Sequence, residues 1–220
     1  MSFGQKLLLI IMTLIIIITP LIIILLLRLY MNSHNDDANE AAMAEFWEKE
    51  RQARFARNAD ISNLQLYKPE LDKLPFLSES AASSDTERVE LEAKVIASAK
   101  EPMLDLHEYS NTDLKIKYGN GNFPALSKYD QNFMYFTRDV YQLAKYLYDN
   151  NYTDDARITL EYLTSVSAES GSAFTMLANI YINAGEPERI SKLIQIVEAT
   201  KDSIQKDTTL RSLRQIINSY

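Results

Sequence analysis

Cysteine is absent from the 220-residue sequence, and histidine occurs only twice, as His34 and His107. The absence of cysteine excludes disulfide bonds, thiolate zinc sites and cysteine nucleophiles. Two histidines leave few side chains for acid–base or metal chemistry. Sequence signatures of nucleophile elbows, nucleotide-binding loops and kinases are also missing. We therefore expect no catalytic residues, no metal site, no cofactor and no small-molecule substrate.

Positive charge is scarcer than negative charge. The sequence has 23 Lys and Arg residues against 30 Asp and Glu residues, which gives a net charge of -7 at pH 7. An acidic protein repels a phosphate backbone unless it carries a local basic patch. We therefore expect no nucleic-acid partner.

One long stretch has no charged residue at all. Leu7 to Leu27 reads "LLLIIMTLIIIITPLIIILLL", and 21 helical residues span roughly 30 Å, the thickness of the hydrocarbon layer of a bilayer. No small-residue cleavage pattern follows it, so the run predicts an uncleaved, single-pass transmembrane helix at about 7–27 within a membrane anchor, residues 1–30. Lys6 before the run favours an inside N-terminus and an extracytoplasmic domain, although Arg28 lies close behind the run.

Residues 31–60 are predicted to form a juxtamembrane helical stalk. Asn39 to Asn58 lacks Gly and Pro, and it sets Glu45 before Lys49 and Glu50 before Arg54 at a spacing of four residues, which supports an exposed helix through ion pairs. A solvated stalk is favoured over a helix that lies on the bilayer or pairs with a partner.

Residues 61–86 are predicted to form an extended segment and a linker. Pro69 and Pro75 interrupt any helix, and "SESAASSDTE" has linker composition. The apolar residues between 61 and 77 are too many to leave in water, so we expect this part to lie against the domain rather than serve as a linear motif.

Residues 87–220 are predicted to form a mainly all-α repeat domain. Ser84 and Glu87 predict a capping-box start for a helix over 87–100. Leu114, Ile116 and Tyr118 alternate with lysines ahead of "GNGN", a pattern that allows one short β-hairpin. At the other end, residues 207–220 are expected to form a C-terminal cap helix.

The centre of this domain repeats itself. "LAKYLYDNNYTDDA", which begins at Leu143, and "LANIYINAGEPERI", which begins at Leu177, align along their whole length at one constant offset. Apolar residues match on both sides of a turn residue, Asn151 in the first unit and Gly185 in the second. Each unit therefore predicts a helical hairpin, with repeats at about 135–168 and 169–202. Pro187 suits the first turn of the second helix.

This pattern resembles the tetratricopeptide repeat, whose unit of about 34 residues carries Leu-Ala or Leu-Gly, then Tyr, then a turn. The likeness covers about residues 135–200; no Trp opens either unit, Ile190 stands where Ala is usual, and the closing Pro is absent. The whole chain also resembles uncharacterised single-pass proteins of Gram-positive anaerobes, a likeness that implies no activity.

Tetratricopeptide proteins commonly bind peptides along a groove lined by the first helix of each hairpin. The resemblance implies a peptide-binding groove made by Arg138, Tyr141, Lys145, Tyr148, Ser172, Thr175, Asn179 and Asn183. Lys145 and Asn179 are one repeat apart, and a cation with an amide suits a peptide carboxylate or backbone. Two alternatives stay open: the chain's own segment 64–77 fills the groove, or these polar residues have no ligand.

These patterns together predict a membrane-anchored adaptor or scaffold that contacts the lipid bilayer through its N-terminal helix and binds a protein or peptide partner through its repeat domain. The alternative is a structural subunit of a membrane complex assembled through the anchor and stalk. An enzyme is disfavoured.

Overall fold

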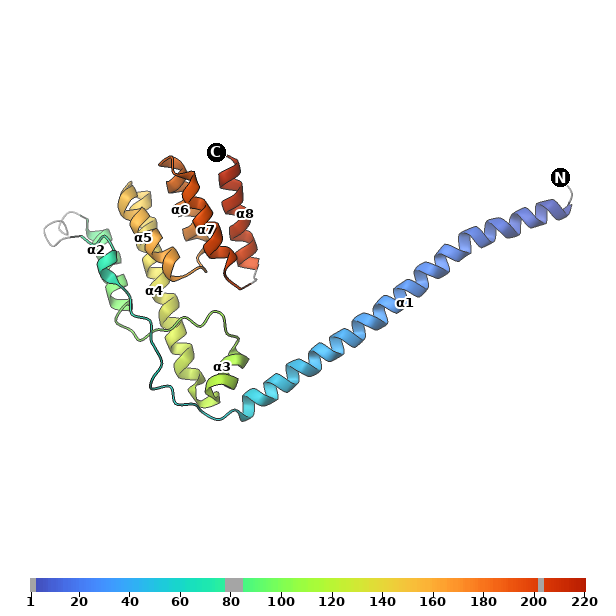
Figure 1. Cartoon of the computed structure of the whole chain (residues 1–220), viewed down its shortest axis with the longest axis horizontal. Helices are drawn as coiled ribbons and strands as arrows, with labels where there is room; N and C mark the ends of the chain where they lie inside the picture. The colour runs from blue at the N-terminus through green and yellow to red at the C-terminus, as the bar shows by residue number, and fades with distance from the viewer. Residues whose placement is uncertain (1–2, 78–84, 202–203) are drawn as a thin grey trace.

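The computed structural model describes residues 3–77, 85–201 and 204–220; within the first helix it does not describe the side chains of residues 3, 5–17, 27 and 29–38. The described chain is mainly helical, as predicted (Figure 1). Its elements are α1 Phe3–Phe55, η1 Leu71–Lys73, α2 Thr86–Ser98, α3 Asn111–Tyr118, η2 Asn120–Asn122, α4 Phe123–Asp149, α5 Thr153–Val166, α6 Gly171–Asn183, η3 Pro187–Arg189, α7 Ile190–Glu198 and α8 Ile204–Asn218.

The helix α1 is continuous through Pro20 and projects away from the domain (Figure 1). The predicted anchor and stalk are therefore parts of a single helix. In the part of the chain that the structure describes, no helix has the length and apolarity needed to cross a membrane. Because the side chains of residues 5–17 and 27 of the predicted span lie outside that part, the transmembrane helix stays a prediction.

The stalk part of α1 forms one of its two predicted ion pairs. Lys49 binds Glu45 at 3.0 Å, but the expected pair of Glu50 and Arg54 is replaced. Glu50 instead accepts a hydrogen bond from Thr112 of α3, because its carboxylate lies on the face of α1 that packs on the domain. Ala53 on the same face is buried. The stalk is thus solvated on most sides but joined to the domain at its end.

The turn after α3 fixes the chain that leaves α1. Gly119 has φ +89°, and a Cβ there would lie 2.4 Å from the Asn58 Cα, so only glycine fits. The Gly121 N–H donates to the Asn58 side chain at 2.9 Å, and the Asn122 amide donates to the Ala59 carbonyl at 2.7 Å. "GNGN" is therefore a turn, as expected, and it anchors residues 58–59.

The predicted strand at 114–118 is wrong, because this segment is the helix α3. Ser110 and Asp113 form a complete capping box, with the Ser110 hydroxyl accepting from the Asp113 N–H at 3.1 Å. Leu114 and Tyr118 are four residues apart and face the core, whereas Ile116 is exposed. The described chain has no β-hairpin, and its one isolated bridge joins Tyr67 to Met103.

The two predicted hairpins are present and end their first helices in the same way. Asn151 and Gly185, which occupy equivalent positions of the two repeats, both have positive φ, 64° and 73°. The Tyr152 N–H donates to the Leu147 carbonyl, and the Glu186 N–H donates to the Tyr181 carbonyl, each at 2.8 Å. These are Schellman turns in register. The same backbone geometry at the same offset confirms that α4–α5 and α6–α7 are equivalent units.

Burial follows the same offset. Val140 and Phe174, Leu143 and Leu177, Ala144 and Ala178, Leu147 and Tyr181, and Ala156 and Ile190 are all buried. The exception is Ile194, which is half-buried, while Leu193 beside it is buried. Ala144 and Ala178 are fully buried, as expected where helices approach closely. The apolar residues that recur at this offset therefore form much of the domain core.

Other elements cover both ends of this double hairpin. α2 packs on α4, and α8 packs on α6 and α7, so that the helices stand in a row from α2 to α8 (Figure 1). α2 begins at Thr86 because Asp85, not the expected Ser84, accepts from the Arg88 N–H; Ser84 lies outside the described residues. Residues 64–77 lie against the domain as predicted, with Leu74 buried in the main core and Leu64 packed on a smaller cluster.

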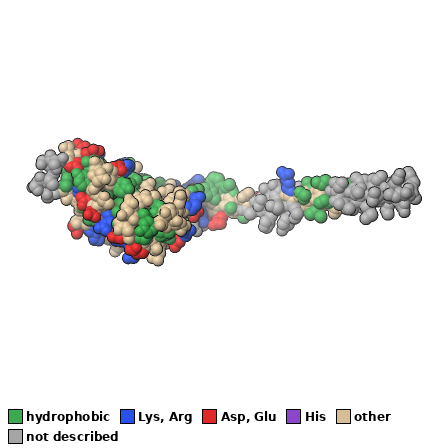
Figure 2. Space-filling view, turned by 90° about the horizontal axis from the view of Figure 1, so that it is seen from above, with side chains coloured by type: hydrophobic (Ala, Val, Ile, Leu, Met, Phe, Trp, Pro, Cys, Tyr) green, Lys and Arg blue, Asp and Glu red, His purple; other side chains and the backbone are tan. Residues whose placement is uncertain are grey.

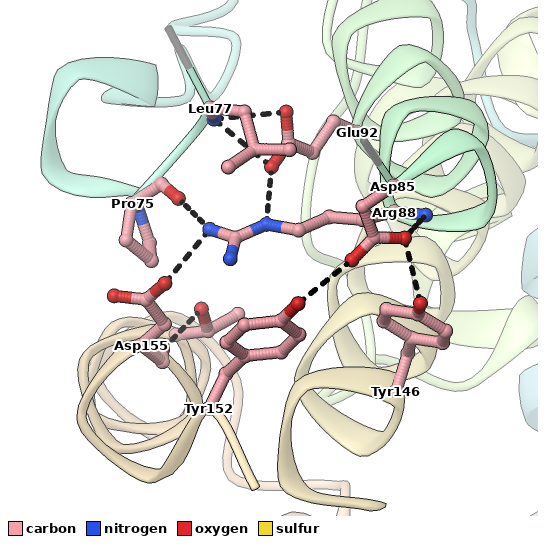
Figure 3. A network of polar contacts seen from close by, with 9 residues as sticks. Pro75, Leu77, Asp85, Arg88, Glu92, Tyr146, Tyr152 and Asp155 are labelled. Atoms are coloured by element: carbon pink, nitrogen blue, oxygen red, sulfur yellow. Dashed lines mark hydrogen bonds and ion pairs between the residues drawn. The ribbon is translucent and has the colours of Figure 1, made fainter. Parts of the chain in front are cut away.

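A buried arginine, Arg88, connects α2 to the extended segment and to α5. The Arg88 side chain is 3% exposed; its guanidinium binds Glu92 at 2.9 Å and Asp155 at 2.8 Å and donates to the Pro75 carbonyl (Figure 3). Glu92 in turn accepts from the Leu77 N–H at 3.1 Å. Burial opposes the charge of Arg88, but Glu92 and Asp155 outweigh it and raise its pKa.

Asp85 extends this network. It accepts hydrogen bonds from the hydroxyls of Tyr146 and Tyr152, at 2.7 and 3.2 Å (Figure 3). The Tyr146 bond, followed by the Arg88 N–H bond, holds the pKa of Asp85 below its usual range. The Tyr152 ring lies under the Arg88 guanidinium at 5.2 Å. Residues 75–92 and 146–155, two regions that are distant in sequence, therefore meet around one cation.

Replacing Arg88 with alanine is expected to lower the free energy of unfolding by about 3–5 kcal/mol, because it leaves the buried Glu92 carboxylate without its cation. The measurement is denaturant-induced unfolding of the full chain in micelles, followed by circular dichroism. Arg138→Ala is the control: Arg138 is exposed and its described ion pair is with its neighbour Asp139, so its loss should stay within about 1 kcal/mol. Equal losses for both variants would contradict a structural role for the network.

Replacing Gly185 with alanine is expected to destabilise the domain by about 1–2 kcal/mol, because a left-handed conformation is unfavourable for a residue with a Cβ. The position has open space around it, so no clash contributes. Gly185→Asn should cost less, since Asn151 holds this conformation in the other hairpin. Thermal melting of both variants checks this, and an alanine variant as stable as the asparagine variant would refute it.

Candidate functional site

A cleft with a volume of about 540 Å³ lies between α6 and α8. α6 contributes Ser172, Thr175, Met176 and Asn179, and Tyr148 contributes from the last turn of α4. α8 supplies the opposite wall. The full lining is Tyr148, Gly171, Ser172, Thr175, Met176, Asn179, Ile204, Gln205, Thr208, Thr209 and Ser212.

The close approach of α6 to α8 is set at one end of the cleft by Gly171. A Cβ at this position would lie 2.5 Å from the Thr209 hydroxyl, so the two helices approach more closely than a larger residue permits. The Gln205 amide donates to the Glu169 carbonyl at 3.0 Å and ties the start of α8 to the loop before α6. The shape of the cleft therefore depends on the close contact of Gly171 with Thr209 and on the hydrogen bond between Gln205 and Glu169.

A second cavity of about 400 Å³ lies beside α4. Arg138 and Tyr141 line it from α4, Asp105 and His107 from the loop before α3, and Glu169 from the loop before α6. A small third cavity shares His107 and Glu169 with the second and Gln205 with the first. The three cavities are therefore neighbours, and the residues they share lie in the loops before α3 and α6 and at the start of α8.

Six of the eight predicted groove residues line these cavities. Tyr148, Ser172, Thr175 and Asn179 line the α6–α8 cleft, and Arg138 and Tyr141 line the second cavity. Lys145 and Asn183 line none of the three. The alternative that residues 64–77 fill the groove is wrong for the α6–α8 cleft, since Tyr67 and Glu70 of this segment bond to Tyr162 of α5.

Lys145 is engaged within its own helix. Its ammonium binds Asp149 at 2.5 Å, and the hydrogen bond to Asp149 raises the pKa of Lys145. Asn179, in contrast, lines the cleft. The structure therefore does not bring this cation and this amide together in one cavity, as the predicted recognition of a carboxylate requires.

The α8 wall is absent from the predicted groove. The sequence pattern identifies residues 207–220 only as a cap with an apolar inner face, and Leu210 and Leu213 of that face are indeed buried. Thr208, Thr209 and Ser212 of α8 line the cleft, and they are the part that the pattern misses. The offset that relates the two hairpins does not extend to α8, because it would match the buried Phe174 and Leu177 with Thr208 and Arg211, so no repeat signal marks this wall.

His107 lies in the second cavity and contacts Asp105. Its Nδ1 is 2.6 Å from the Asp105 carboxylate. Partial burial opposes protonation, but the hydrogen bond and charge of Asp105, with Glu169 and Glu108 nearby, outweigh it and raise the pKa of His107. In the described part of the chain, no group of three or more His, Asp or Glu residues is arranged to hold a metal ion.

The His107 pKa can be measured. We expect a value above the ordinary 6.5 in an NMR titration of the histidine ring protons, and a lower value in Asp105→Asn, because that variant removes the carboxylate. The pair therefore stabilises the folded state below pH 6.5, and this contribution disappears as the pH rises through the higher folded-state pKa. Unchanged titration in Asp105→Asn would show that the contact is not formed.

Comparison with known proteins gives no relative: no family model, no curated protein and no solved structure matches this sequence. The tetratricopeptide likeness and the likeness to single-pass proteins therefore stay predictions from the sequence.

Proposed function

We propose that this protein is a membrane-anchored adaptor that binds a segment of a protein partner in the cleft between α6 and α8. The observation that carries the proposal is the cleft itself, because four of the residues that the tetratricopeptide resemblance implies for a groove line it together with one face of α8. Stacked helical hairpins characteristically use such an extended inner surface for binding.

The anchor is the second part of the proposal. The uncharged run Leu7–Leu27 has the length of a membrane span, and α1 continues from it to Phe55, where it joins α3. In this arrangement the protein resides in the cell membrane by a single pass. The domain lies on the extracytoplasmic side, in keeping with Lys6 before the run.

A second candidate function rests on α1 instead of the cleft. Met43, Phe46 and Trp47 are 55%, 51% and 60% exposed, and the rings of Phe46 and Trp47 contact each other edge to face. Large apolar side chains on one stretch of an exposed helix are a contact surface for another helix. In this alternative the protein is a structural subunit that assembles through anchor and stalk.

The two functions can be separated by site-specific photo-cross-linking in native membranes. A photoreactive residue replaces Ser172 in the cleft, Ala44 on α1 or Ser191 on α7. We expect one polypeptide to be captured from position 172 and not from position 191. The purified partner should then bind the intact protein at least tenfold more tightly than the Thr208→Glu variant, which places a charge in the cleft.

Other cross-linking patterns decide against the cleft. Capture from position 44 alone would contradict the adaptor function and support the structural-subunit function. Equal capture from positions 172 and 191 would indicate that the contacts do not depend on the cleft.

A further inference from the structure

The α6–α8 cleft is lined entirely by uncharged side chains, although 24% of the residues of the protein are charged. A charged group that entered it would lose water without finding an opposite charge among the lining residues. The part of a partner that enters the cleft is therefore uncharged. A peptide carboxylate, which Lys145 with Asn179 suggested in the sequence, does not fit this lining.

The hydroxyl groups of the cleft are less available than its composition suggests. Each of the four hydroxyl side chains Thr175, Thr208, Thr209 and Ser212 donates to the carbonyl four residues earlier in its own helix, at 2.8–3.1 Å. A hydroxyl has one proton to donate. These side chains therefore offer no hydrogen-bond donor, and the threonines also carry methyl groups.

Two larger side chains add apolar surface. Met176 lines the cleft from α6, and Ile204 lines it from α8. Ile204 is 86% exposed, the highest value among the described large apolar side chains. Covering an exposed apolar side chain with a partner lowers the free energy, so the lining favours an apolar partner surface.

The shortage of donors also favours a helix over an extended chain. A strand needs donors for its free carbonyl groups, and among the described lining residues the side-chain donors that remain are Ser172, Asn179, the Tyr148 hydroxyl and the second amide proton of Gln205. A helix arrives with its backbone groups already paired. Helix-in-groove binding needs apolar side chains on one face, which is what this lining complements.

We infer that the cleft binds the uncharged, apolar face of an amphipathic helix of a protein partner. This inference rests on the proposed function and names the partner's chemistry. The cleft runs along α6 from Gly171 to Asn179, which corresponds to about 12 Å, so it holds roughly two helical turns of the partner.

The test is a selection with two peptide libraries on the full-length protein in lipid nanodiscs. One library displays a helical scaffold with randomised residues at positions i, i+3, i+4 and i+7. The other displays random peptides with a central proline, which do not form a helix. We expect enrichment from the helical library, with uncharged apolar residues at the randomised positions.

Two matched variants show whether selected peptides use the cleft. Ser172→Glu and Ser191→Glu each place a carboxylate at the second residue of a helix, α6 or α7. Both changes suit a helix start equally. Binding of the selected helices should fall at least tenfold in Ser172→Glu and stay within twofold in Ser191→Glu, with equal melting temperatures.

The remaining outcomes distinguish failure of the helical-partner inference from failure of the proposed binding function. Enrichment from the proline library alone, with loss in Ser172→Glu, would overturn the helical partner and keep the binding cleft. Helical hits with charged residues at the face positions would overturn its apolar chemistry. Enrichment from neither library, or hits that bind Ser172→Glu unchanged, would overturn both.

Discussion

A helical hairpin cannot bury its apolar face alone, and this constraint determines the rest of the domain. α4–α5 and α6–α7 cover each other on one side only. The side chains of Phe136, Leu143, Phe174 and Leu177 are at most 1% exposed because α2 with residues 67–77 closes one end of the stack and α8 closes the other. The parts outside the repeat are therefore as necessary to the core as the repeat itself.

The two ends of the helix stack are covered through different kinds of interaction. α8 packs with Leu210 and Leu213, whereas the other end includes a buried cation. A buried ion pair contributes little net stability compared with apolar packing. Here residues 64–77 are largely extended and pair through a single described bridge, so their backbone groups need partners. Arg88 bonds the Pro75 carbonyl and Glu92 bonds the Leu77 N–H, which explains why charges occupy this position.

The extended segment also brings aromatic groups into contact. The Tyr67 ring lies edge to face with Phe133, and its hydroxyl meets that of Tyr162 at 3.0 Å. The Tyr162 hydroxyl in turn accepts from the Glu70 N–H. Burial, followed by the bond to Tyr162, raises the pKa of Tyr67 far above its usual value. The segment is thus bound by hydrogen bonds and ring contacts at the end of the stack that α2 also covers.

Local signals made much of this fold predictable. The turn residues Asn151 and Gly185 stand at a fixed offset because both tolerate the left-handed conformation, so the hairpins could be identified from the sequence. The same local reasoning failed at α3, where two lysines gave a false alternation that hid the Ser110–Asp113 capping box. The capping box favoured a helix more strongly than the alternation of residues 114–118 favoured a strand.

Contacts between distant residues were not predictable. The bond between Asp85 and Tyr146 joins residues 61 positions apart, and nothing near either residue indicates it. The cleft could be predicted only in part, because its chemistry also depends on the folded helices. Thr175 and Asn179 were expected to line a groove. The sequence identifies Thr175 as a polar residue, but in the folded helix its hydroxyl donates to the carbonyl of Gly171 and is not free to bind a partner.

The charge distribution gives the proposed anchor a consequence for binding. Charged side chains of both signs are scattered among apolar and polar ones on the face of the domain that Figure 2 shows, and the protein as a whole carries a net charge of -7. If Leu7–Leu27 spans a bilayer, residues 28–55 of α1 hold the domain up to roughly 40 Å from the lipid surface, because an α-helix rises about 1.5 Å per residue. This distance is several times the Debye length at physiological salt, so the charges of the domain act on a protein partner and not on lipid head groups. The uncharged cleft therefore selects an uncharged segment of that partner, while α1 determines how far from the membrane the partner is bound.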